Sequence, residues 1–97
     1  MHGRETEVDT AMVIRDKLTT ALKPVHLEVI DDSARHAGHA GARPGGQSHF
    51  RALIVSSAFE GLSRVARQKL VYAALAQELA GSVHALSITT RTPDEAV

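Results

Sequence analysis

Residues 49–61 read HFRALIVSSAFEG, and this stretch decides the fold because it joins a strand to the start of a long helix. Its first eight positions combine an aromatic ring with β-branched and aliphatic side chains, a composition typical of a buried strand. A turn, or a short turn of helix, follows at Phe59. Ser63 is then suited to cap a helix that runs to about Leu79 and is closed by Gly81. The sequence therefore predicts strand, turn and helix in succession.

The preceding segment adds one helix and one strand. In residues 9–22 apolar side chains recur at helical spacing after an N-cap at Asp9 or Thr10. Residues 25–30 are rich in β-branched side chains and end at a turn signal, which predicts a strand. We expect this strand to pair with the strand that begins at His49.

The third strand lies near the C-terminus, in residues 83–90, VHALSITT, where apolar and polar side chains alternate. The element order is therefore α-β-β-α-β, an α+β sandwich with a mixed three-stranded sheet and helices on one face. Because the chain is short, we expect one domain over residues 1–97, with a disordered start (1–8), a mobile loop (33–48) and a frayed tail (91–97).

The long helix carries an arc of mostly small apolar side chains when its residues are placed at about 100° per residue. These side chains are Val65, Ala66, Ala73, Ala76 and Ala80. We expect the arc to pack closely on the sheet. Lys69 falls within it, where its ammonium group must reach water or a partner.

Composition limits the classes of function. The 97 residues include 11 basic and 11 acidic side chains, so no global charge attracts the chain to nucleic acid or to an anionic membrane. The absence of cysteine excludes disulfides, all-thiolate zinc sites and a cysteine nucleophile, so iron–sulfur chemistry would need a thiolate from another molecule. No apolar run is long enough to cross a membrane, and the N-terminus has no apolar signal region, so we expect a cytoplasmic protein.

Histidines gather in residues 35–50, RHAGHAGARPGGQSHF, which hold His36, His39 and His49. Three imidazoles can bind zinc, but glycine-rich flanks do not hold rings rigidly and no HExxH pattern is present. A self-contained zinc site is therefore disfavoured. His84 differs because it begins a strand, where its ring can be held still; considered alone, it is more often a structural histidine than a ligand.

Two features bear on nucleic-acid binding. Residues 38–41 match the GxxG of KH domains, but they lie between two strands, whereas that loop joins helices in a KH domain. Arg64, Arg67 and Lys69 form a modest basic patch, although such charges usually belong to a solvated helix face. No nucleophile elbow, phosphate loop or paired carboxylates are present, so we predict that the protein is not an enzyme.

Several short motifs occur together in a specific order and spacing. They are Asp32-Ser33-x-x-His36, Gly45-x-x-x-His49-Phe50-x-x-x-Ile54-Val55-Ser56, Phe59-x-Gly61, Val65-x-Arg67-x-Lys69-x-Val71-Tyr72, Val83-His84-Ala85-Leu86 and Thr92-Pro93-x-Glu95. In this arrangement the chain resembles the BolA family over roughly residues 10–95. The resemblance implies a KH-like (class II) fold with the element order given above.

The resemblance also implies a function. BolA-like proteins partner monothiol glutaredoxins and share a bridging [2Fe–2S] cluster, with thiolates supplied by the glutaredoxin and its glutathione. By position, the imidazole ligands of this chain are His84 and His36, with His39 as an alternative to His36, while His49 is expected to be structural. Such mixed ligation is similar to the Rieske type. The free chain is then expected to be a monomer that binds no cluster by itself and no membrane.

An alternative follows from the same resemblance, since some BolA-like proteins are reported as transcriptional regulators with affinity for DNA. The residues expected to contact DNA are Arg64, Arg67 and Lys69. The Arg-His-Arg run of the family reads Arg67-Gln68-Lys69 here, which removes an imidazole and keeps two cations.

Overall fold

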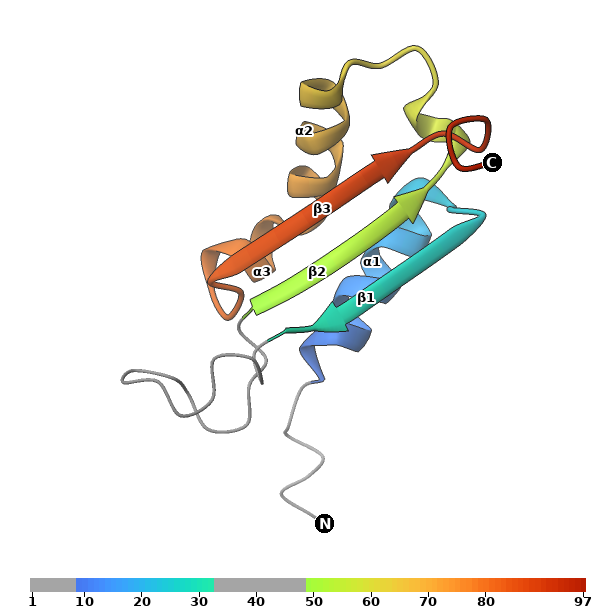
Figure 1. Cartoon of the computed structure of the whole chain (residues 1–97). Helices are drawn as coiled ribbons and strands as arrows, with labels where there is room; N and C mark the ends of the chain where they lie inside the picture. The colour runs from blue at the N-terminus through green and yellow to red at the C-terminus, as the bar shows by residue number, and fades with distance from the viewer. Residues whose placement is uncertain (1–8, 33–48) are drawn as a thin grey trace.

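Three strands form one sheet in the order β1-β2-β3, with the helices along one of its faces (Figure 1). The computed structural model describes residues 9–32 and 49–97, so the expectations for residues 1–8 and 33–48 lie outside the described part. The elements are α1 Thr10–Leu22, β1 His26–Asp31, β2 His49–Val55, the 3-10 helix η3 Ser57–Phe59, α2 Arg64–Ala74, α3 Ala76–Ala80 and β3 Ala85–Arg91. The predicted α+β fold with its mixed sheet is confirmed.

The two strand pairs have opposite directions. β1 pairs with β2 in antiparallel fashion, with His26 opposite Val55 and Ile30 opposite Arg51. β2 pairs with β3 in parallel, with His49 opposite Ala85. A parallel pair needs a long crossover, and η3, α2 and α3 provide it. The register places the starts of β2 and β3 at the same end of the sheet.

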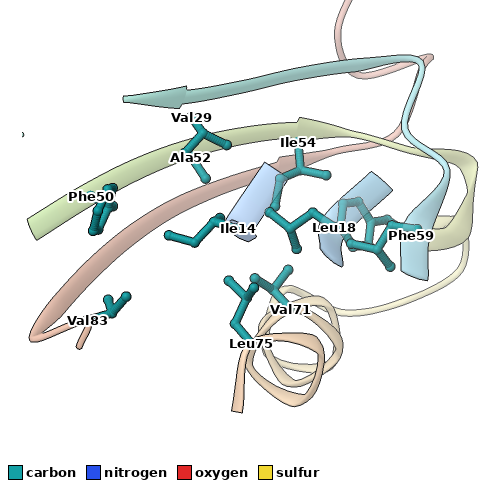
Figure 2. Close-up of a cluster of buried hydrophobic side chains, with 11 residues drawn as sticks. Ile14, Leu18, Val29, Phe50, Ala52, Ile54, Phe59, Val71, Leu75 and Val83 are labelled. Atoms are coloured by element: carbon teal, nitrogen blue, oxygen red, sulfur yellow. The ribbon is translucent and has the colours of Figure 1, made fainter. Parts of the chain in front are cut away.

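The core lies between the sheet and the helices (Figure 2). Alternate side chains of β2 enter it because a strand turns every second residue to the same face. Its buried apolar members are Ile14, Leu18, Leu22, Val29, Phe50, Ala52, Ile54, Phe59, Val71, Leu75 and Val83. Aliphatic side chains dominate this core, as the scarcity of aromatic residues requires.

Serine and aspartate side chains fix where the helices begin. Asp9 Oδ1 accepts a hydrogen bond from the Met12 amide at 3.3 Å, and Ser63 Oγ accepts one from the Ala66 amide at 3.1 Å. Each bond satisfies an amide that has no partner within its own helix. The predicted N-cap at Ser63 is confirmed, and of the two predicted for α1 the structure selects Asp9.

The single long helix predicted after Ser63 is two helices. The break falls at Leu75, where φ is −110° and ψ is 21°, and the Leu75 side chain is buried in the core. α3 ends before Gly81, as expected.

The predicted packing of the alanine arc is wrong. Val65 is 60% exposed, and Ala73, Ala76 and Ala80 also face solvent, while Val71 and Leu75 are buried. Larger apolar side chains gain more from leaving water than alanine does, so they decide which face of α2 packs inward. Lys69 is consequently exposed, with its charge in water.

The C-terminal segment expected to be frayed forms a hydrogen-bonded turn. β3 continues to Arg91, and the amides of Glu95 and Ala96 donate to the Thr92 carbonyl at 3.0 and 3.2 Å. Thr92 itself is buried. None of the helices in the described residues has the length and apolar character that a membrane crossing requires.

Candidate functional site

His84 is held in place by its two neighbours. Val83, on one side, is buried in the core, and its amide donates to the Glu78 carbonyl at 2.9 Å. Ala85, on the other side, is the first residue of β3 and lies opposite His49. His84 itself, predicted to begin a strand, directly precedes β3 and is exposed. Its backbone is therefore anchored while its imidazole faces solvent.

His49 lies beside His84. It is the first residue of β2, it is half-buried, and its carbonyl accepts a hydrogen bond from the Asp32 amide at 2.7 Å. The His49 and His84 rings meet edge to face, with centroids 6.4 Å apart and planes at 79°. The structure thus brings together two imidazoles at one end of the sheet, one on the first residue of β2 and one on the residue before β3.

Sequence reasoning did not foresee this pair, since it gave His49 a structural role. The pair follows from the parallel pairing of β2 with β3, because His49 lies opposite Ala85 and His84 is the residue before Ala85. The other predicted imidazole ligands, His36 and His39, lie outside the described residues. Within residues 9–32 and 49–97, no group of three or more histidine or acidic side chains is arranged to hold a metal ion.

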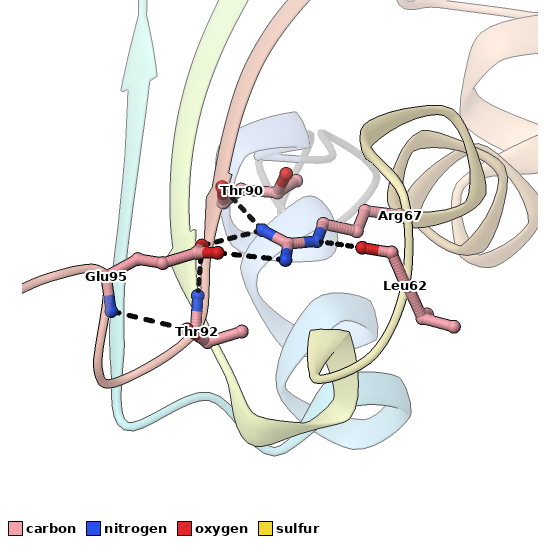
Figure 3. Close-up of polar contacts among 5 residues, drawn as sticks. All are labelled: Leu62, Arg67, Thr90, Thr92 and Glu95. Atoms are coloured by element: carbon pink, nitrogen blue, oxygen red, sulfur yellow. Dashed lines mark hydrogen bonds and ion pairs between the residues drawn. The ribbon is translucent and has the colours of Figure 1, made fainter.

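Arg67, predicted to contact DNA, is engaged within the chain (Figure 3). Its Nη1 and Nη2 atoms donate to Glu95 Oε1 and Oε2 at 2.7 and 3.1 Å. Its Nε atom donates to the Leu62 carbonyl at 3.0 Å, and Nη1 also approaches the Thr90 carbonyl at 3.4 Å. The guanidinium carbon lies 5.9 Å from the centroid of the Phe59 ring.

The electrostatics of this pair follow from the same contacts. The hydrogen bonds from Arg67, followed by the Thr92 amide at 2.9 Å, lower the pKa of Glu95 to about 2. The bond to Glu95 in turn raises the pKa of Arg67. The Arg67 side chain is only 12% exposed. The charge of Arg67 is thus paired with Glu95 of the same chain, and this ion pair holds the C-terminal turn against α2.

The other two basic residues predicted to contact DNA, Arg64 and Lys69, are exposed on α2. Arg64 lines a groove of about 240 Å³ between α2 and β3, together with Gln68, Ile88, Thr89, Thr90 and Arg91. Any DNA contact by α2 would therefore rest mainly on Arg64 and Lys69.

Comparison with known proteins shows which family this chain belongs to. The family model described as BolA-like protein matches residues 18–95. The chain belongs to the BolA-like family. It is 54% identical over 80 residues to BolA-like protein 1 of Homo sapiens, covering 82% of this chain and 56% of that relative. The BolA-like chain thus spans little more than half the length of that relative.

Two further BolA-like relatives support the assignment. The solved BolA domain of SufE1 from Arabidopsis thaliana superposes with a TM-score of 0.80 at 47% identity, covering 92% of this chain and 98% of that domain. The DNA-binding transcriptional regulator BolA of Escherichia coli is 43% identical over 82 residues, covering 84% of this chain and 74% of that relative. SufE-like protein 1 of Arabidopsis thaliana is named as chloroplastic/mitochondrial, so the cytoplasmic location expected here stays a prediction.

Proposed function

We propose that this BolA-like chain is a non-enzymatic adaptor that binds a monothiol glutaredoxin and contributes imidazoles to a [2Fe–2S] cluster shared with it. The observation that carries the proposal is the exposed imidazole of His84, on an anchored backbone and 6.4 Å from the His49 ring. Membership of the BolA-like family supports it.

The donor set fits a shared cluster and not a private one. A [2Fe–2S] cluster takes four protein ligands, and in Rieske centres two histidines hold one of the two irons. This chain contains no cysteine, so the thiolates must come from the glutaredoxin and its glutathione. When bound, the cluster would supply an iron pair whose reduction potential is raised by imidazole ligation.

The roles of the histidines follow from their positions. His84 is the fixed ligand because Val83 and Ala85 hold its backbone on both sides. The second imidazole comes from His36 or His39, and we propose His49, whose ring centroid lies 6.4 Å from that of His84, as a third choice. Only a neutral imidazole can bind iron, so we expect the complex to lose its cluster in acid.

The test is to assemble the complex from this chain, a monothiol glutaredoxin and glutathione, and to record its visible absorption and circular dichroism. We expect a coloured heterodimer, and we expect His84→Ala to change its spectrum. His26→Ala is the matched control, because His26 is also exposed but lies at the opposite end of the sheet, across from Val55. A spectrum that responds equally to the two substitutions would remove His84 from the ligand set.

DNA binding is the second candidate function, favoured by the similarity to the Escherichia coli regulator. In this chain it would use Arg64 and Lys69, which α2 exposes to solvent. Because phosphate contacts release counterions, DNA affinity should fall steeply with salt and should weaken in Arg64→Ala. Binding that ignores salt, or that survives this substitution unchanged, would count against the function.

A further inference from the structure

β3 is an edge strand, and some of its backbone amides and carbonyls point away from the sheet. Within the part of the chain that the structure describes, it pairs with β2 alone, and its far edge carries no strand. The Arg91 carbonyl points toward β2, where it accepts from the Ser56 amide at 2.9 Å, whereas the Thr90 carbonyl points outward to Arg67. Backbone polar groups alternate in direction along a strand, so those of Leu86 and Ile88 also point outward.

The side chains of β3 are less covered than those of β2. Phe50, Ala52 and Ile54 of β2 are buried beneath the helices, while Leu86 and Ile88 on the same face of β3 are only half-buried. The groove between α2 and β3 lies over Ile88 and takes in Thr90 as well. A side chain of a bound partner that entered this groove would be partly shielded from water by α2 and β3.

The groove is also positively charged. Arg64 on α2 and Arg91 at the end of β3 both line it, together with Gln68 and Thr89, and among residues 9–32 and 49–97 no acidic residue lines it. Arg64 and Gln68 are four residues apart and therefore share one face of α2. An anionic group entering the groove meets guanidinium and hydroxyl donors.

We propose that this groove binds an extended acidic polypeptide, which adds to β3 as a fourth strand and presents carboxylates to Arg64 and Arg91. Outward-pointing amides and carbonyls at Leu86 and Ile88 match the hydrogen bonds that an added strand makes. A nucleic acid offers no such ladder, and the chain has a net charge of zero. This surface is the outer edge of β3, separate from His84, and its occupation needs neither cluster nor glutaredoxin.

The experiment titrates the isotope-labelled full chain with a capped heptapeptide of alternating glutamate and valine, up to millimolar concentration, and follows amide chemical shifts. We expect the largest changes at Leu86, Ile88 and Thr90, with slower hydrogen exchange of the Ile88 amide. Arg64→Glu should weaken peptide binding by roughly threefold to tenfold, because it replaces one exposed ion pair with a repulsion between like charges. Arg15→Glu, the same change on the exposed side of α1, should leave binding unchanged.

Four results would overturn the proposal. They are equal binding of the matching lysine–valine peptide, shifts centred away from β3, no shifts at millimolar peptide, or tighter binding of an oligothymidylate in the same groove. The last result would assign the groove to nucleic acid instead. Because the assay contains no iron and no glutaredoxin, its failure leaves the proposed cluster function untouched, and the failure of that function leaves this proposal intact.

Discussion

The two ends of β3 differ in how their polar side chains are used. Beyond its C-terminal end, Glu95 binds Arg67, whose guanidinium also reaches two carbonyls and lies over Phe59. Before its N-terminal end, His84 is exposed beside His49 on an anchored backbone. Polar groups that pair with one another inside the chain contribute to the stability of the fold, whereas an exposed imidazole on an anchored backbone is suited to contact a partner. We therefore assign stability to the first end and propose that the second end meets the partner.

The largest effect on stability should come from Phe59→Ala, at the Arg67 end. Phe59 is fully buried. Truncating such a ring removes apolar contacts and leaves a cavity, so the free energy of unfolding should fall by about 3–5 kcal/mol in urea denaturation. If the protein lost much less than this, the view of the Arg67 end as a structural anchor would have to be abandoned.

A pH-dependent effect should follow from Glu95→Gln. The pKa of Glu95 is lowered to about 2 in the folded protein, below its ordinary value of 4.5. The ionised carboxylate therefore stabilises the fold fully above about pH 4.5, and that contribution is lost as the pH falls toward about 2. The variant should have a lower urea midpoint than the wild type at neutral pH, and the gap should close in acid.

The matched control for that series is Glu60→Gln, a change at an exposed glutamate in the turn before α2. It should leave the urea midpoint close to that of the wild type. A gap for Glu95→Gln that stays constant from neutral to acid pH would show that the Arg67 contact does not depend on the charge of the carboxylate.

A smaller effect should come from Ser63→Ala, which removes the N-cap of α2. The loss of the hydrogen bond to the Ala66 amide should lower the free energy of unfolding by about 1 kcal/mol, with Ser63→Asp restoring most of it. Failure of aspartate to rescue would mean that serine acts at this position by something other than capping.

The smallest effect on stability should come from His84→Ala, at the other end of β3. The side chain is exposed, so the free energy of unfolding should change by no more than about 0.5 kcal/mol in the same urea experiment. A loss as large as that of Phe59→Ala would erase the distinction between the two ends.

Local signals predicted much of the fold. The caps at Asp9 and Ser63 depend on contacts three residues away, and the strands follow from composition and alternation, so each can be read from a short window. The face of α2 that packs against the sheet could not be predicted in this way. It depends on whether Val71 and Leu75 or the alanines occupy the core.

The site was predictable only in part. His84 was predicted to be a ligand through its motif, and the structure shows it exposed next to the first residue of β3. Its pairing with His49 depends on the parallel register of β2 and β3, which no short window contains. Likewise, the contact of Arg67 with Glu95 joins residues 28 apart in sequence, so Arg67 looked like a surface cation.

We propose that His84 supplies a ligand to a cluster shared with a monothiol glutaredoxin. The most direct measurement is the visible circular dichroism of the heterodimer assembled with His84→Ala, beside the wild type and His26→Ala. We predict an altered or lost cluster signal for His84→Ala, an unchanged one for His26→Ala, and stable folding of both variants. A wild-type spectrum from folded His84→Ala, in a complex that still forms, would show that His84 is not a cluster ligand.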